Sequence, residues 1–469
     1  MDLGRAKGFQ DLASKTLEGR GQFPAAGLFG IISFYALLVT IAVFSIPYGA
    51  VEIWHKSLLI LFVSVIAGFR IIDSVTGRSF RIAEPLLLSP LFGILALAFI
   101  QIVQWPGTTS AISVDPYETR SFILIFGALI VAAEVLFFYT TTAYRLKCLV
   151  VLVIAVGAGS AVFGLLREFY FDSLPDLLAA FLFPEQGFAQ FINRNHFALL
   201  IEMSFGLLLG ILIRGELSEK FKFLCWLLAG IMAYSLIAAN SRGGLVSMAA
   251  LVLFAISVHM MTREETGNSE REYSRHKHVE SGTLFRKMSA TAGLLVLIFG
   301  LIVFMIAFVG GDTAVTRIEK LKGEFETVNN AGVNRNLIWN STMEMIESEP
   351  ILGVGFGGYA AAIPKFETSG GKYRLQQAHN DYLEILSNGG IVGFALFALF
   401  GVIVVHRTSK NLRSDDRLRR ASCFGAAIGF FGVLIHSFVD FGLHIPVNAF
   451  IFAVLVVIAT ANIQRTTEN

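Results

Sequence analysis

The chain has little charge, little cysteine and no excess of charge of either sign. Only 15% of its 469 residues are charged while 55% are hydrophobic, and the mean hydropathy is +0.66. These values exclude disorder and do not suit a soluble globule of this length. The formal net charge of +2 gives no indication of nucleic-acid binding. Cys148, Cys225 and Cys423 lie far apart in apolar segments, so we expect small buried side chains rather than disulfide partners or metal ligands.

Long apolar runs take the place of charge. A membrane-spanning helix needs ~20 mostly apolar residues, and the runs predict an all-α polytopic membrane protein with about twelve transmembrane helices. Three regions follow: residues 1–310 with nine spans, a helical loop domain at 311–389, and residues 390–469 with three spans. The predicted spans lie near residues 28–47, 57–72, 86–104, 121–140, 148–167, 197–213, 221–239, 243–261, 290–310, 390–406, 421–439 and 447–462.

The loops between these runs predict the orientation. With the N-terminus inside, the inner segments hold 23 Lys and Arg residues and the short outer loops hold 4. Basic residues collect on the cytoplasmic side, so both termini are expected in the cytoplasm and the loop 311–389 outside. The first residues are polar and mildly basic, so no cleavable signal peptide is expected.

Two acidic residues and two glycine pairs fall inside predicted spans. Carboxylates at the bilayer centre are costly and usually face the bundle interior. Glu134 and Glu202 are therefore interpreted as neutralised or internally paired, with a functional relay as the alternative. The spacings Gly206 to Gly210 and Gly425 to Gly429 permit close helix contact, interpreted as packing within the chain.

The loop 311–389 contains two predicted helices. Asn334 is a plausible cap for a helix that begins with Arg335 and stops before Pro350. A second helix is expected from Gln376 to Asn388, ending at Gly389 and Gly390. His379 would then lie in a first helical turn, where the helix dipole favours a neutral imidazole able to accept a proton.

Basic and imidazole side chains gather on the outer face of this topology. The arginine fork suits phosphate oxygens, and several arginines around one pocket would suit a lipid diphosphate. Each residue alone has a simpler explanation: an interface anchor for Arg242, a surface charge for Arg335, a polar loop residue for His379. Together they predict an outward-facing site for an anionic, phosphorylated, lipid-borne substrate. The outer set comprises Arg194, His196, Arg242, Arg335 and His379.

At these residues the sequence resembles the bacterial superfamily of O-antigen ligases and O-antigen or exopolysaccharide polymerases. The resemblance rests on NRNLIWNSTMEMIESEPILGVGFGGY at 334–359 and on HNDYLEILSNGGIVG at 379–393. Supporting stretches are NRNHFA at 193–198, SRGG at 241–244 and DFGLHIPVNA at 440–449. The first five spans resemble the superfamily in topology alone.

The resemblance implies a fold like that of the type C membrane glycosyltransferases, in a bacterial inner membrane with a periplasmic active site. It implies a metal-independent, inverting transfer of a saccharide from undecaprenyl diphosphate to an acceptor hydroxyl, without a cofactor. The acceptor would be lipid A-core or a growing glycan. Arg242 and Arg335 match the arginines that contact the diphosphate, and His379 matches the essential histidine proposed as the base. Possible substrate contacts are Arg194, His196, Asn380, Asp381, Tyr382 and His444.

Several functions stay open at this point. Ligation to lipid A-core, polymerisation of lipid-linked repeats and transfer to protein Ser or Thr share the residues that handle the donor. A polytopic transporter or flippase would predict internal repeats and charges at the membrane midplane. The two halves show no convincing repeat, and the charges gather outside the membrane. The loop from Asp440 to Pro446, with His444, either lines the acceptor entrance or is a simple turn.

Overall fold

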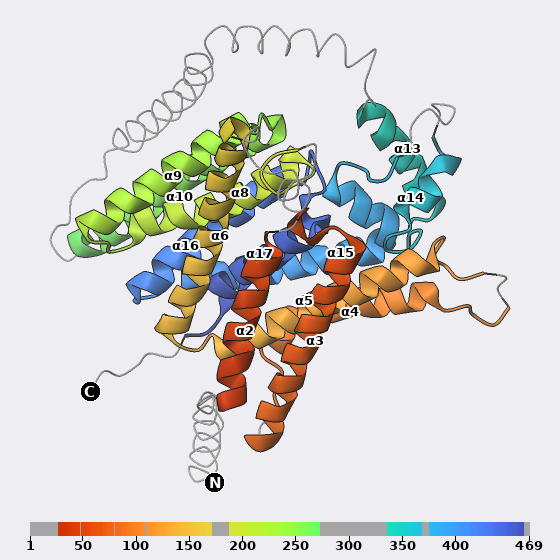
Figure 1. The fold of residues 1–469 in the computed structure, drawn as a ribbon, viewed down its shortest axis with the longest axis horizontal. Helices are drawn as coiled ribbons and strands as arrows, with labels where there is room; N and C mark the ends of the chain where they lie inside the picture. Colours follow the sequence, from red (N-terminus) through yellow and green to blue (C-terminus); the bar gives the residue numbers. More distant parts are fainter. Residues whose placement is uncertain are drawn as a thin grey trace, which may run out of the picture.

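The structure is a computed structural model, and it describes residues 27–272, 335–367 and 375–463 apart from 47, 79, 108–109 and 171–186. The described part is a bundle of helices (Figure 1). Its long helices are α2 (Leu28–Phe44), α3 (Ile53–Thr76), α4 (Pro85–Ile102), α5 (Pro116–Tyr139), α6 (Ala143–Tyr170), α8 (Arg194–Arg214), α9 (Glu219–Ala238), α10 (Arg242–Glu272), α15 (Asp381–Asn411), α16 (Arg417–His436) and α17 (Pro446–Thr460).

Nine helices in the described ranges are long and apolar enough to cross a membrane, and α2 and α17 are shorter apolar helices. These eleven helices correspond to eleven of the twelve predicted spans. The twelfth, near 290–310, lies outside the described residues, as does 311–334 of the predicted loop domain. The predicted class, an all-α polytopic membrane protein, is confirmed.

Local sequence signals begin many of these helices. Asp115, Asn193, Asn380 and Asp416 each accept hydrogen bonds from backbone N–H groups of the first turn that follows, which satisfies donors that a helix start leaves unpaired. Proline occupies the first position of α4, α5 and α17, where its missing N–H costs nothing.

The closest helix packing joins α8 to α16. A Cβ added at Gly210 would lie 2.2 Å from Gly425 Cα, and one added at Gly206 would lie 2.6 Å from Gly429 N. Small residues let two backbones approach in this way. The predicted internal role of the two glycine pairs is therefore confirmed.

Both intramembrane acids are paired inside the bundle. Glu134 Oε1 lies 3.2 Å from Arg70 Nη2, which α3 supplies. Glu202 Oε1 lies 2.8 Å from His436 Nδ1 across the interface of α8 and α16, where both side chains are almost fully buried. The interpretation of these acids as internally paired agrees with the structure.

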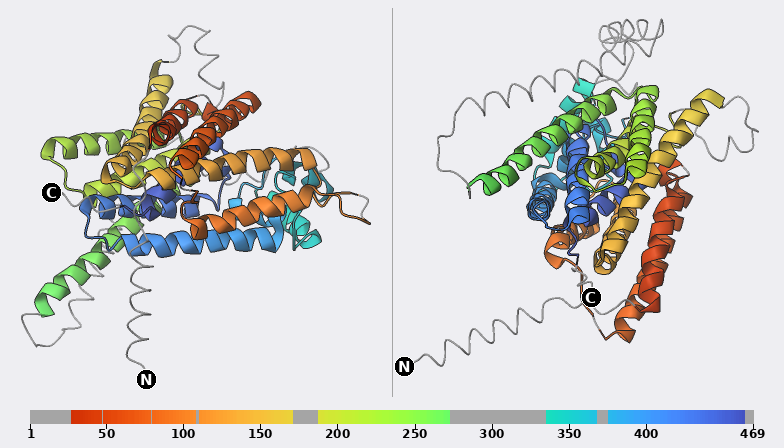
Figure 2. Two further views of the ribbon diagram at one scale, coloured as in Figure 1. Left: turned by 90° about the horizontal axis from the view of Figure 1, so that it is seen from below. Right: turned by 90° about the vertical axis from the view of Figure 1, so that its left-hand side faces the viewer.

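The loop region forms a small subdomain beside the N-terminal end of α15. It contains α13 (Arg335–Ser348), α14 (Tyr359–Ala362) and the 3-10 turn η3 (Ile363–Lys365), and Figures 1 and 2 show α13 and α14 together at one end of the bundle. Its own apolar core includes Ile338, Met345 and Tyr359. We call this end of the molecule the α13 end.

The helix after the loop differs from the prediction. It begins at Asp381 rather than Gln376, because Asn380 caps it. The predicted end at Gly389 and Gly390 agrees with the structure, because the backbone at Gly390 (φ 59°, ψ -166°) is not helical, and a second helical segment of α15 continues from there to Asn411. At the kink the N–H of Ile391 donates to the carbonyl of Pro350, so a neighbouring segment satisfies a backbone donor that the kink releases.

Candidate functional site

The ends of five helices meet at the α13 end. Ser241 Oγ, just before α10, donates to Asn195 Oδ1 at the start of α8 over 2.8 Å. Asn448 Nδ2 of α17 donates to the carbonyl of His196 over 3.0 Å. The N–H of Asp381 donates to the carbonyl of Ser437, the residue after α16. These bonds join residues that are 46, 252 and 56 positions apart in the chain.

His379 lies where these ends converge, but not in a helix. It immediately precedes the capping Asn380 and has φ 51°, a left-handed conformation. The predicted position in a first helical turn, and the helix-dipole argument that used it, are therefore wrong. A non-glycine residue held in this conformation indicates that its surroundings fix it.

The ring of His379 is oriented by Asp440. His379 Nδ1 lies 3.3 Å from Asp440 Oδ1, and the Asp440 side chain is fully buried while that of His379 is 35% exposed. Burial alone raises the pKa of Asp440, but the hydrogen bond with His379 and the nearby His196 and His436 outweigh it and lower the pKa to about 2. Asp440 is therefore a carboxylate at neutral pH, and it fixes the orientation of the imidazole.

One aromatic ring contacts two imidazoles at this point. Phe441 meets His379 edge to face at 4.9 Å between ring centroids, and it also meets His196 edge to face at 4.9 Å. Phe441 thereby links the start of α8 to His379, and it restricts the ring of each histidine.

Ala378, the residue before His379, is held by hydrogen bonds at both its backbone N–H and its backbone carbonyl. The N–H of Ala378 donates to Glu384 Oε2 over 3.0 Å, and its carbonyl accepts from Trp339 Nε1 over 3.1 Å. Trp339 belongs to α13 and Glu384 to α15, so the two helices clamp the segment that carries His379.

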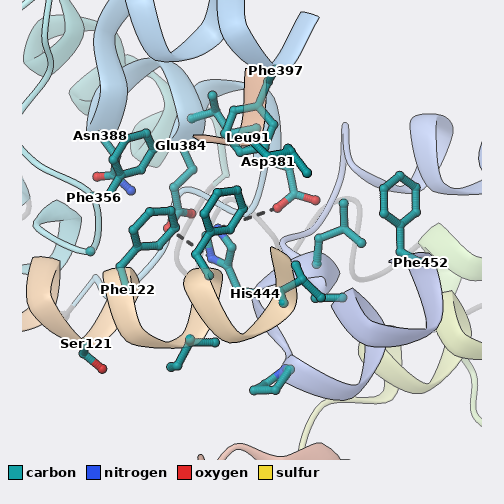
Figure 3. A pocket seen from close by; sticks show the side chains of 18 of the residues that line it. Leu91, Ser121, Phe122, Phe356, Asp381, Glu384, Asn388, Phe397, His444 and Phe452 are labelled. Carbon is teal, nitrogen blue, oxygen red and sulfur yellow. Dashed lines mark ion pairs between the residues drawn. The ribbon is translucent and has the colours of Figure 1, made fainter. Parts of the chain in front are cut away.

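A second cluster of titratable groups lies beside the first. His444 Nδ1 lies 3.3 Å from Glu384 Oε1 and 3.1 Å from Gln377 Oε1, and His444 Nε2 lies 4.0 Å from Asp381 Oδ1. Asp381 Oδ2 accepts from Ser437 Oγ. Figure 3 shows Asp381 and Glu384 both directed at His444, along one wall of a cavity of about 580 Å³.

The predicted site residues divide into three groups. His379, His196, Asp381 and His444 lie together at the α13 end. Arg194 and Arg242 are exposed at the first positions of α8 and α10, which the Ser241 bond holds side by side. Arg335 begins α13, and its side chain lies outside the described residues.

Two of the predicted substrate contacts serve the fold. The side-chain oxygen of Asn380 accepts from the N–H groups of Tyr382 and Leu383 as a helix cap. The hydroxyl of Tyr382 donates to the carbonyl of Leu434, and its ring packs on Phe438. Their contacts with a substrate stay a prediction.

Asp440 and Glu384 are the residues that the sequence argument did not assign. The signal for Asp440 was present, since an acidic residue directly after an outer span end begins the stretch DFGLHIPVNA. Within the described ranges, no group of three or more His, Cys, Asp or Glu side chains is arranged to hold a metal ion.

Fold and site together define a multi-pass membrane protein with a histidine and carboxylate pair at one end of the bundle. Residues 227–398 match the family model described as O-antigen ligase. The matched part is similar to that family, and it contains Arg242, Arg335 and His379. A comparison with curated proteins gives no match.

Proposed function

We propose that the protein is a membrane glycosyltransferase that moves a saccharide from undecaprenyl diphosphate to an acceptor hydroxyl on the periplasmic face. The observation that carries the proposal is the pair of His379 and Asp440, which has the geometry of a base with its orienting carboxylate. The O-antigen ligase match supports the reaction class.

The reaction follows from the chemistry of the pair. A neutral His379 with its proton on Nδ1 donates to Asp440 and keeps Nε2 available to accept the proton of an acceptor hydroxyl. The acceptor oxygen then bonds to the anomeric carbon of the donor sugar, the bond from that carbon to the diphosphate oxygen breaks, and the configuration inverts. Asp440 stabilises the imidazolium that forms.

The leaving group requires cations. Negative charge grows on the diphosphate oxygen in the transition state, and positioned donors there often contribute most of the catalysis. Arg242 and Arg335 are the proposed diphosphate ligands, and Arg194 is a further candidate because α8 and α10 begin side by side. The planar guanidinium of arginine can bind two phosphate oxygens at once, so it suits a phosphate better than the ammonium of lysine does.

A reconstituted assay tests this function. The protein in nanodiscs receives an undecaprenyl-diphosphate-linked oligosaccharide and a chelator, with or without lipid A-core, and products are separated by gel and mass spectrometry. His379→Ala should abolish transfer while folded protein is still obtained, and it should lower the melting temperature because the buried Asp440 loses its hydrogen-bond partner. His406→Ala, an exposed histidine in the C-terminal half of α15, is the matched control and should transfer normally.

The product identifies the acceptor. Product formed only with lipid A-core indicates a ligase, and a ladder of longer lipid-linked chains without added acceptor indicates a polymerase. Product on Ser- or Thr-containing peptides indicates a protein transferase. Full activity in His379→Ala would contradict the assigned base, and no transfer to any of the three acceptors by folded protein would contradict the proposed function.

A further inference from the structure

The cavity beside His444 has an apolar body. It runs between α4, α5, α15 and α17, and it is lined there by Leu88, Leu91, Phe126, Leu129, Phe397 and Phe452. Figure 3 shows aromatic and aliphatic side chains from several of these helices converging on the space. A volume of about 580 Å³ lies in the range of small-molecule sites, and such a lining favours a hydrocarbon chain over a solvated group.

The polar end of the cavity contains several hydrogen-bond acceptors. The carboxyl groups of Asp381 and Glu384 line it. Asn388 lines it too, and its Oδ1 is buried without a hydrogen-bond partner in the protein. A buried acceptor left unpaired is costly, so it indicates a donor supplied from outside the chain. Sugar hydroxyls can donate to such groups, whereas the oxygens of an ionised diphosphate can only accept.

The charged residues of the lining also favour a sugar head over a diphosphate head. Asp115 and Glu118 line the cavity beside Asp381 and Glu384, and Lys56 is the one Lys or Arg among the described residues that line it. Burial lowers the pKa of His444 to about 4, so this imidazole is neutral at pH 7. A diphosphate would meet more carboxyl groups than cations here.

We propose that this cavity binds the acceptor, an amphiphile whose uncharged, hydroxyl-rich head contacts Asp381, Glu384 and Asn388 and whose hydrocarbon chain lies along α4, α5 and α17. The inference rests on the proposed transferase function, because it names the acceptor class for that site. Donor and acceptor then approach His379 from two sides. The arginines at the starts of α8 and α10 lie on the side of His196, and the cavity lies on the side of Glu384.

Two photoreactive lipids with the same alkyl chain test the assignment. One carries an uncharged disaccharide head and the other carries a diphosphate head, and each is cross-linked to the full-length protein in nanodiscs. Labelled peptides are mapped by mass spectrometry. We expect the disaccharide lipid to label the cavity-lining parts of α5 and α15 at least ten times more than the diphosphate lipid does.

Four variants locate the labelling. Ala133→Phe fills the body of the cavity and should remove labelling by the disaccharide lipid, whereas Leu124→Phe, on the exposed side of the same helix, should not. Asn388→Ala removes the unpaired acceptor and should weaken labelling several-fold even if the filled variant does not fold. His379→Ala should label normally while it loses transfer.

The outcomes separate this inference from the proposed function. Equal or stronger labelling by the diphosphate lipid would overturn the acceptor assignment, and so would disaccharide labelling that Ala133→Phe leaves intact in folded protein. Labelling no stronger than on the exposed face of α5 would overturn it as well. The proposed function is measured by transfer in the reconstituted assay, so it can fail while the labelling result stands.

Discussion

Asp440→Asn is the substitution that tests the candidate site most directly. It keeps the size of the side chain and removes the charge that orients His379. The buried carboxylate accepts from the Phe441 N–H over 3.0 Å as well as contacting His379. Its pKa falls from the ordinary 3.8 to about 2 because the hydrogen bond and the neighbouring imidazoles outweigh the effect of burial.

The size of the effect follows from that pKa. One pKa unit corresponds to about 1.4 kcal/mol, so folding stabilises the ionised form of Asp440 by about 2 kcal/mol. Because the folded-state pKa is lowered, this stability is fully present above the ordinary pKa of 3.8 and is lost as the pH falls toward about 2. The Asn variant should lose about 2 kcal/mol at pH 7, and transfer should fall roughly 10²-fold or more because His379 loses its orienting carboxylate.

Melting temperature and transfer rate, measured on the same nanodisc preparation, provide the assay. The melting temperature of the Asn variant should lie below that of the wild type at pH 7. The difference between the two should narrow below about pH 4, because Asp440 of the unfolded wild-type chain takes up a proton there and the stabilisation is lost. Asp415→Asn, on an exposed turn between α15 and α16, controls for removal of one negative charge. Unchanged melting and unchanged transfer in Asp440→Asn would refute the reasoning.

Three further predictions concern packing and positioning. Gly210→Leu should prevent folding, because even a Cβ there would lie 2.2 Å from the backbone of α16. The control Gly230→Leu should fold, because a Cβ at Gly230 meets nothing within 4 Å. Equal yields of the two variants by size-exclusion chromatography would contradict the helix contact. Glu134→Gln should lower the melting temperature by an amount equivalent to roughly 1–3 kcal/mol, since it leaves a buried guanidinium without its anion; no shift would show that the ion pair adds nothing. Trp339→Phe removes the hydrogen bond to the Ala378 carbonyl. It should lower kcat about tenfold, in proportion to a lost hydrogen bond of ~1.4 kcal/mol, and leave KM for the lipid-linked saccharide unchanged. A change in KM alone would exclude this positioning role.

Much of the architecture is local in origin and could therefore be predicted. Hydropathy over ~20 residues specifies a spanning helix wherever it occurs, and eleven predicted spans appear as apolar helices. Caps at Asn193 and Asp416 follow from side chains that reach their own backbone. The glycine spacings predicted close contact because a missing side chain has the same effect on any partner helix.

The candidate site depended on contacts that no local pattern contains. The sequence identified His379 through a motif, but its partner Asp440 lies 61 residues later and reaches it only because α16 ends beside the start of α15. The start of α15 was mispredicted because helical periodicity continues through Gln376, while the Asn380 cap and the hydrogen bonds from Trp339 and to Glu384 hold the preceding residues outside the helix.

The cavity shows the same division between sequence and structure. Its apolar residues were each recognisable as parts of spans, but the space exists only where α4, α5, α15 and α17 pack without filling it. The sequence determined which segments cross the membrane and which motifs belong to the superfamily, because both are properties of short stretches. Which charges meet, and which faces of the helices enclose a ligand, were decided by packing between distant segments, because those energies depend on the distances that only the assembled bundle sets.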